Sequence, residues 1–182
     1  DKYFMKLAIK EAKKANNDVF PNPKVGCLIV KDGKVVSKGF HKRFGGRHAE
    51  QVAIDNLPQK ITNATMYVTL EPCAHKGKTS PCIDLIDPSI FNRVVISSLD
   101  PNPSASGGIK AILNKKISVT KNICKIKSKK INPRFFTYHE KKRPYVILKA
   151  ALTLDGFIAE SNGLSKWITN ENSRQSVHEL RS

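Results

Sequence analysis

Two short stretches of this sequence combine residue types that bind metals and transfer protons. The first is His48-Ala49-Glu50, which follows Gly-Gly-Arg, and the second is LEPCAHKGKTSPC, which contains Cys73 and Cys82. One imidazole and two thiolates can bind zinc through three protein ligands and leave a fourth position open for water, as in catalytic zinc sites. We therefore predict that His48, Cys73 and Cys82 bind one zinc ion per chain.

The role that we predict for Glu50 is proton transfer. Zinc lowers the pKa of its bound water toward 7, and a carboxylate beside that water can take its proton and pass it to a leaving amine. Zinc-dependent base deaminases carry H-x-E followed by P-C-x-x-C for this purpose. H-A-E alone arises often by chance and a single cysteine is more often a buried small residue, but the two motifs together indicate a deaminase. Because Glu50 lies about 200° around a helix from His48, the two converge only if the metal lies over the first helical turn.

Composition narrows the remaining classes of protein. The chain has 182 residues, of which 40% are hydrophobic, and this is enough for one well-buried domain and part of a second. No apolar run reaches the ~18–20 residues of a membrane span, so we expect no membrane partner. The first residues, DKYFMKLAIKEAKKA, lack the features of a signal peptide. With four cysteines a disulfide scaffold is not expected, and a reducing, cytoplasmic setting is predicted.

The net charge of +17 raises the question of a nucleic-acid partner. Of the 32 basic residues, 25 are lysine and 7 are arginine, whereas arginine is the residue whose planar fork suits phosphate and base recognition. The lysines are scattered, apart from a denser run at Lys125 to Lys130. The composition therefore disfavours nucleic-acid binding without excluding a functional polyanion surface, and it leaves a homo-oligomer open.

The elements that must position the two motifs alternate between helical and strand periodicity. Apolar residues at helical spacing predict an amphipathic helix over residues 3–15. Asp32-Gly33 between two apolar runs predicts a β-hairpin. Further helices are expected at 48–56, after Pro81 and at about 107–113, and further strands at 66–70, 94–98 and 117–120. Strands separated by helices predict a three-layer α/β domain, with helices on both faces of a central sheet.

The character of the sequence changes near residue 121. Residues 122–143 are rich in lysine, and Pro133 suits the first position of a helix capped by Asn132. Arg143-Pro144 introduces a new apolar strand at 145–149. We therefore predict a zinc deaminase domain at 1–121, a basic linker or helix at 122–143 and the beginning of a second domain at 144–182, because thirty-nine residues cannot bury a core alone.

The spacing of the cysteines distinguishes among deaminases. Eight residues separate Cys73 from Cys82, where the generic pattern has two. This longer loop, together with PNPKVGC, GFH, HAE and DPNP, resembles the deaminase domain of the bifunctional riboflavin-biosynthesis deaminase/reductase family. The stretch RPYVILKAALTLDGFIAESNGLSKWIT is similar to the opening of that family's reductase domain, so the resemblance covers essentially the whole chain. It implies a cytidine-deaminase-like domain with a mixed sheet, followed by the first elements of a dihydrofolate-reductase-like α/β domain.

The resemblance implies the hydrolytic deamination of 2,5-diamino-6-(5-phosphoribosylamino)pyrimidin-4(3H)-one, with Glu50 as the proton shuttle. A phosphorylated substrate needs an anion-binding group near the metal, and Lys78 in the long loop is the implied phosphate partner, with His41 and His75 nearby. The implied contacts to the base or ribose are Asn22, Asp100 and Asn102. Asn and Asp beside proline are also ordinary turn residues, so both roles are open for these three.

The second part of the chain resembles the start of an NADPH-dependent oxidoreductase. The resemblance implies that Ala151 and Trp167 contact NADPH and that Ser165 and Arg181 contact the substrate of the reductase. A lone tryptophan more often anchors a core. Because the chain stops before most of a nucleotide-binding fold, both a fragment of a longer multifunctional protein and an enzyme that has lost its reductase remain open.

Two alternatives come from other classes of protein. A deaminase of tRNA adenosine would suit the positive charge, but it would be favoured by a short C-x-x-C spacing and a terminal helix rich in base-contacting residues, and this sequence has neither. A structural zinc or nucleic-acid-binding module normally has four protein ligands. Cys27 falls within a predicted strand and Cys124 lies far along the chain, so no fourth ligand is at a matching position.

Overall fold

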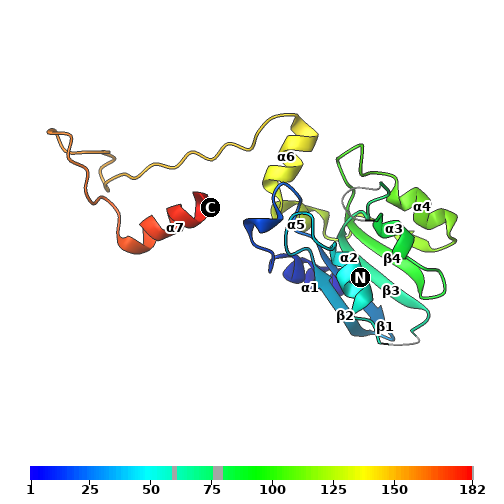
Figure 1. Cartoon of the computed structure of the whole chain (residues 1–182). Helices are drawn as coiled ribbons and strands as arrows, with labels where there is room; N and C mark the ends of the chain where they lie inside the picture. The colour runs from blue at the N-terminus through cyan, green and yellow to red at the C-terminus, as the bar shows by residue number, and fades with distance from the viewer. Residues whose placement is uncertain (59–60, 76–79, 182) are drawn as a thin grey trace. The chain divides into compact units, whose positions relative to one another are not determined.

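A five-stranded mixed sheet organises the first part of the chain (Figure 1). The computed structural model describes residues 1–58, 61–75 and 80–181. The strand order is β2-β1-β3-β4-β5, in which β1 is antiparallel to β2 and β3, whereas β3, β4 and β5 are parallel. The strands are β1 (Gly26–Lys31), β2 (Lys34–Phe40), β3 (Ala64–Leu70), β4 (Phe91–Ser98) and β5 (Ser118–Thr120). The predicted α/β fold with a mixed sheet is confirmed.

The hairpin between β1 and β2 forms where the sequence predicts it. Asp32 has φ 48° and Gly33 has φ 72°, and a two-residue hairpin turn of the favoured mirror-image type requires positive φ at both positions. The turn sets the register, in which Lys31 faces Lys34 and Val30 faces Val35.

Side chains that alternate along the strands build a core on each face of the sheet. In β3, Met66 and Val68 belong to one buried cluster and Tyr67 to the other. In β4, Val94 belongs to the first cluster and Val95 to the second. Because both faces are apolar, both must be covered by helices.

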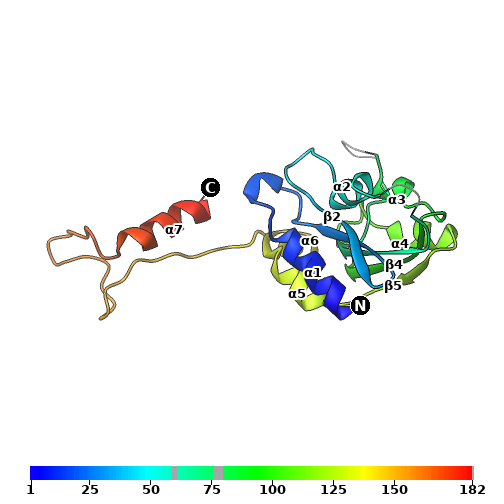
Figure 2. The same ribbon diagram turned by 90° about the horizontal axis from the view of Figure 1, so that it is seen from below.

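The helices form the two outer layers (Figures 1 and 2). The first cluster includes or contacts residues of α2 (Ala49–Asp55), α3 (Cys82–Leu85) and α4 (Gly108–Asn114). The second cluster includes α1 (Lys2–Ala12), and Figure 2 shows α5 (Lys125–Lys130) beside α1 on that face. Helix α2 lies very close to β2, because a Cβ added to Gly39 would be 2.5 Å from the Ala49 carbonyl oxygen.

The segment predicted as a basic linker or helix, residues 122–143, packs against the sheet. It contains α5 and α6 (Pro133–Lys141), and the first compact unit of the chain extends from Asp1 to Tyr145. The Ser128 hydroxyl donates to the Thr69 carbonyl oxygen at 2.7 Å. Asn132 precedes Pro133 at the start of α6 as predicted, but its side chain makes no capping hydrogen bond. Instead, Asn132 Oδ1 accepts the N–H of Lys24 at 2.7 Å and Asn132 Nδ2 donates to the carbonyl oxygen of Lys24 at 2.9 Å. The side-chain amide of Asn132 is therefore bonded to Lys24 and does not cap α6.

Residues 146–182 form a separate unit, which contains α7 (Glu171–Arg181). The strand predicted at 145–149 is wrong for the described residues: the backbone there is not in a strand, because strand hydrogen bonds require a neighbouring strand and none pairs with it. Leu148 is 93% exposed, and α7 has no buried residue. Over the described ranges of the chain, no helix has both the length and the apolar character needed to cross a membrane.

Candidate active site

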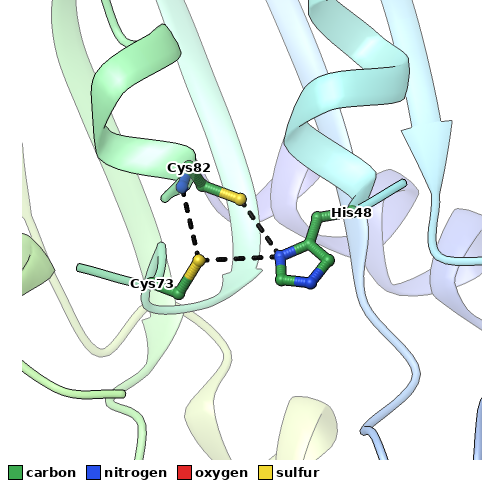
Figure 3. Close-up of side chains that lie close together, drawn as sticks. All are labelled: His48, Cys73 and Cys82. Atoms are coloured by element: carbon green, nitrogen blue, oxygen red, sulfur yellow. Dashed lines mark hydrogen bonds between the residues drawn. The ribbon is translucent and has the colours of Figure 1, made fainter. Parts of the chain in front are cut away.

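Three side chains from separate elements converge beside the carboxyl end of β3 (Figure 3). His48 immediately precedes α2, Cys73 follows the end of β3, and Cys82 is the first residue of α3. Their ligand atoms all lie within 4.8 Å of one another. The predicted zinc ligands are therefore together in the structure, and the zinc-binding site is supported by geometry as well as by motif.

The distances fit a tetrahedral zinc ion. His48 Nδ1 lies 3.2 Å from Cys82 Sγ and 3.6 Å from Cys73 Sγ. Usual Zn–N and Zn–S bond lengths with a tetrahedral angle place nitrogen and sulfur about 3.6 Å apart. The donor set and spacing thus suit zinc, and Nδ1 is the imidazole nitrogen that faces both sulfur atoms (Figure 3).

His48 is the residue that lets Glu50 share this site. Its backbone is extended, with φ −72° and ψ 161°, so it lies outside the helix that Glu50 belongs to. The His48 N–H donates to Gln51 Oε1 at 3.0 Å, which fixes the entry into α2. The expected 200° separation around a helix does not apply, because the two residues do not belong to one helix.

The two thiols are electronically different. A hydrogen bond from the Cys82 thiol lowers the pKa of Cys73, and the pKa of Cys82 is raised because it keeps the shared proton. The Cys82 N–H also donates to Cys73 Sγ at 3.3 Å. These contacts stabilise a thiolate at Cys73, the form in which cysteine binds a metal.

Glu50 is a carboxylic acid buried beside the three predicted ligands, with an exposed fraction of 3%. Burial raises its pKa, and the charge of His48 acts in the opposite direction. A raised pKa makes the protonated form more accessible, as a group that both accepts and donates protons requires.

A cavity of about 280 Å³ opens beside these residues. His48, Glu50 and Cys73 line it. The positions implied as substrate contacts that also line it are Asn22, His41, His75, Asp100 and Asn102. Lys78, the implied phosphate partner, lies outside the described residues.

His41 is held in place by two hydrogen bonds. Its Nδ1 lies 2.9 Å from the carbonyl oxygen of Arg47, and its Nε2 lies 3.2 Å from Asn22 Nδ2. The acceptor at Arg47 assigns the proton to Nδ1, and Nε2 then accepts from Asn22. Burial lowers the pKa of His41. This geometry suits a neutral imidazole that orients the Asn22 amide better than it suits a counter-charge for phosphate.

Asp100 and Asn102 form the turn that sequence reasoning left open. The Asn102 N–H donates to Asp100 Oδ1 at 2.8 Å, and the Ser104 N–H donates to Asn102 Oδ1 at 3.1 Å. Burial raises the pKa of Asp100 to about 6. Both residues are thus turn formers that also line the cavity.

Among the lining residues that have no role in the sequence-based prediction are Glu71 and Phe135. Glu71 is buried, and its carboxylate accepts the N–H of Asp100 at 3.3 Å and the N–H of Ile109 at 3.1 Å. Its place in the Glu-Pro-Cys triplet was a usable signal. Phe135 lines the cavity from α6, and no periodicity or motif connects a residue so distant along the chain to the zinc ligands.

The positions implied for NADPH and reductase substrate all lie in the second unit. Trp167 is 70% exposed, and the Arg174 guanidinium lies 4.1 Å from the centroid of its ring. Ser165 is exposed, Ala151 is half-buried and Arg181 ends α7. Among the residues that the structure describes, no hydrogen bond or ion pair joins these four positions.

Comparison with known families divides the chain in two. Residues 1–98 match the model of the cytidine and deoxycytidylate deaminase zinc-binding region, and residues 144–182 match the model of the RibD C-terminal domain. The riboflavin biosynthesis protein RibD of Aquifex aeolicus is 47% identical over 182 residues, which are 100% of this chain and 51% of that protein. RibD of Escherichia coli is 40% identical over 182 residues, 100% of this chain and 50% of that protein. The chain therefore spans about half the length of these curated relatives.

Solved structures of similar proteins also match nearly the whole of this chain and about half of their own length. The diaminohydroxyphosphoribosylaminopyrimidine deaminase/5-amino-6-(5-phosphoribosylamino)uracil reductase of Thermotoga maritima matches with a TM-score of 0.90 and 48% identity, over 99% of this chain and 52% of that one. Acinetobacter baumannii RibD matches with a TM-score of 0.93 and 41% identity, over 99% and 51%. A dCMP deaminase from the cyanophage S-TIM5 matches with a TM-score of 0.54 at 19% identity, over 66% of this chain and 94% of that one, and shares the fold alone.

Proposed function

Because the chain belongs to the cytidine and deoxycytidylate deaminase zinc-binding family, we propose that it deaminates the diaminopyrimidinone ribosylamino phosphate of riboflavin biosynthesis by zinc-dependent hydrolysis. The observation that carries this proposal is the convergence of a His/Cys/Cys cluster and a buried Glu50 on one cavity. The similarity to RibD proteins over the full chain supports the choice of substrate.

His48, Cys73 and Cys82 would hold the metal. Zinc bound by these three ligands supplies a Lewis acid that lowers the pKa of water toward 7 and makes it a nucleophile at neutral pH. Glu50 takes one proton from the attacking water and delivers it to the ring nitrogen, and then takes the second proton of the same water and delivers it to the departing amine, which leaves as ammonia. The bond between the ring carbon and its 2-amino group breaks. The oxygen of water becomes a carbonyl oxygen on that carbon, and the amino group leaves as ammonia.

The remaining cavity residues bind and orient the substrate in this proposal. Asn22, oriented by His41, lines the same cavity as Asp100 and Asn102. Amide and carboxyl groups of this kind can bond the polar edge of a pyrimidinone or a ribose hydroxyl. Lys78 and His75 are proposed as partners of the phosphate.

We assign residues 144–182 to the start of an NADPH-dependent reductase domain, supported by the match to the RibD C-terminal domain. Ala151 and Trp167 would contact NADPH there, and Ser165 and Arg181 the substrate. None of the four cysteines is in a disulfide, which suits the reducing, cytoplasmic setting that we propose.

The substrate is tested by replacing Lys78 with Ala. A point-charge contact to the phosphate is made equally in the ground state and the transition state, so KM should rise by the equivalent of about 1.5–3 kcal/mol with little change in kcat. Zinc content should stay the same. Dephosphorylated substrate should show the same weakness on the unsubstituted protein and little further loss on the variant.

The tRNA alternative is tested by the same assay. A tRNA-directed enzyme would lose affinity steeply as salt increases and would not act on the free pyrimidine. If the phosphorylated pyrimidine releases no ammonia while tRNA adenosine is converted, the proposed substrate is wrong.

A further inference from the structure

Helix α6 contributes a wall to the cavity although it lies outside both segments that the family models match. Those segments are 1–98 and 144–182, and Phe135 of α6 lines the cavity together with Asn22, Glu50 and Asp100. In Figure 1, α6 (yellow) follows α5 at the end of the first unit.

Two anchors hold α6 where it is. The buried side chain of Asn132 bonds both backbone groups of Lys24, and Lys24 belongs to the same short loop as Asn22. Phe136 is 5% exposed and has the Lys129 ammonium 5.0 Å from its ring centroid. The helix thus connects directly to the loop that carries one of the proposed substrate contacts.

Phe135 is oriented within this frame by its aromatic neighbours. Its ring centroid lies 5.5 Å from that of Phe136, edge to face, and 4.6 Å from that of His139. Phe135 is half-buried, whereas Phe44, the other phenylalanine lining the cavity, is 43% exposed on a loop. Phe135 is therefore an aromatic surface, fixed by its neighbours, in a cavity that also has apolar lining residues such as Val25 and Leu70.

A pyrimidinone ring needs two kinds of contact. Its edge carries hydrogen-bonding groups, for which Asn22, Glu50 and Asp100 are available. Its faces are flat and apolar, and they pack favourably on an aromatic side chain. We propose that Phe135 packs against the heterocyclic ring of the substrate, and that Asn132 is a positioning residue that holds α6 for this contact. The inference rests on the proposed deaminase function and assigns one of its specificity-determining residues.

The contact is tested with Phe135→Leu and Phe135→Tyr in the zinc-loaded protein. Leucine keeps apolar bulk but loses the flat ring, so KM should rise and kcat/KM should fall about tenfold, as expected for one stacking contact. Tyrosine keeps the ring and should remain within a few-fold of the unsubstituted protein. Tyr138→Ala is the matched control, because Tyr138 is on the same helix and 62% exposed, and its kinetics should not change.

Binding of the deaminated product gives a second readout that does not require turnover. Its Kd, measured by calorimetry, should increase in Phe135→Leu in parallel with KM, while zinc content and the thermal unfolding midpoint stay near those of Tyr138→Ala. Unchanged KM and product affinity in Phe135→Leu would overturn the role of Phe135 and leave the proposed deaminase function standing. Failure of the unsubstituted protein to release ammonia from the phosphorylated pyrimidine would instead reject the proposed function.

The role of Asn132 is tested by a double-mutant cycle. Asn132→Ala removes both hydrogen bonds to Lys24 and should raise KM several-fold at constant zinc content, and Asn132→Asp, which keeps the acceptor for the Lys24 N–H, should recover part of the loss. If Asn132 acts through Phe135, Asn132→Ala should add little in the Phe135→Leu background. Fully additive effects would show that Asn132 does not position Phe135.

Discussion

His48 and Glu50 serve one site because only Glu50 belongs to helix α2. The extended backbone at His48 aims its Nδ1 at both cysteine sulfur atoms, while Glu50 in the first turn of the helix is buried beside the cavity. A metal ligand and a proton shuttle need different surroundings, since the ligand must be deprotonated and the shuttle must change protonation state. The change of backbone conformation within three residues suits both the ligand role proposed for His48 and the proton-shuttle role proposed for Glu50.

Replacing Glu50 with Gln separates these two roles. Glutamine keeps the size of the side chain and is not a predicted ligand, so about one zinc ion per chain should remain bound. Turnover should fall on the order of 10²–10⁴-fold, the contribution of one general acid–base group. Elemental analysis and ammonia release measured on the same preparation check both parts, and turnover close to that of the unsubstituted protein would remove Glu50 from the mechanism.

Asp100 makes the stability of the protein depend on pH. Burial raises its pKa from 3.8 to about 6, so the fold favours the protonated form. This contribution to stability is fully present below about pH 4 and is lost as the pH rises through about 6. Asp100→Asn cannot ionise and still offers an oxygen to the Asn102 N–H, so its stability relative to the unsubstituted protein should increase between pH 4 and 7 by on the order of 1–3 kcal/mol.

The difference in unfolding free energy between the two proteins, measured by denaturant titration at several pH values, checks this prediction. Asp87→Asn is a matched control, because the Asp87 carboxylate is exposed, its pKa is lowered by the N–H of Ser89, and its replacement should give no gain over this range. A difference for Asp100→Asn that stays constant from pH 4 to 7 would show that its carboxyl group is not perturbed.

At the scale of elements, the start of α4 is fitted against the loop that carries Cys73. Gly107 has φ 102°, and a Cβ on Gly108 would lie 2.0 Å from the Pro72 carbonyl oxygen. Glu71 joins the same parts, because its carboxylate accepts the N–H of Ile109 in α4. The glycine pair and Glu71 together hold the Pro72-Cys73 backbone close to α4.

Gly108→Ala should therefore disturb the metal site from a distance. The methyl group forces Pro72 or α4 to move, with a cost of about 1–3 kcal/mol in stability. Because Pro72 adjoins Cys73, zinc affinity should fall as well. Competition with a chromophoric chelator measures the affinity, and Lys110→Ala, an exposed change on the same helix, should leave it unaltered. Equal zinc affinity in the two variants would mean that this contact does not position Cys73.

At the scale of the whole molecule, local patterns were predictable and long-range contacts were not. Asp32-Gly33 specifies its hairpin because the turn needs only two neighbouring residues with positive φ. The cysteine spacing and H-A-E identify the cluster because the chemistry of zinc restricts the ligand types. The contacts of Asn132 with Lys24 join residues 108 positions apart, and periodicity carries no information about such pairs. The expected strand at 145–149 needed a pairing partner, which an apolar run alone does not supply.

The most direct test of the account is ammonia release from the phosphorylated diaminopyrimidinone, followed on one sample through zinc removal and zinc return. Protein that contains about one zinc ion per chain should release ammonia steadily, should lose this activity after chelation, and should regain it when zinc is restored. The Cys82→Ser variant should not retain zinc, and its ammonia release should not recover when zinc is added. Release that continues at the original rate after the metal is gone would contradict a zinc-dependent deaminase.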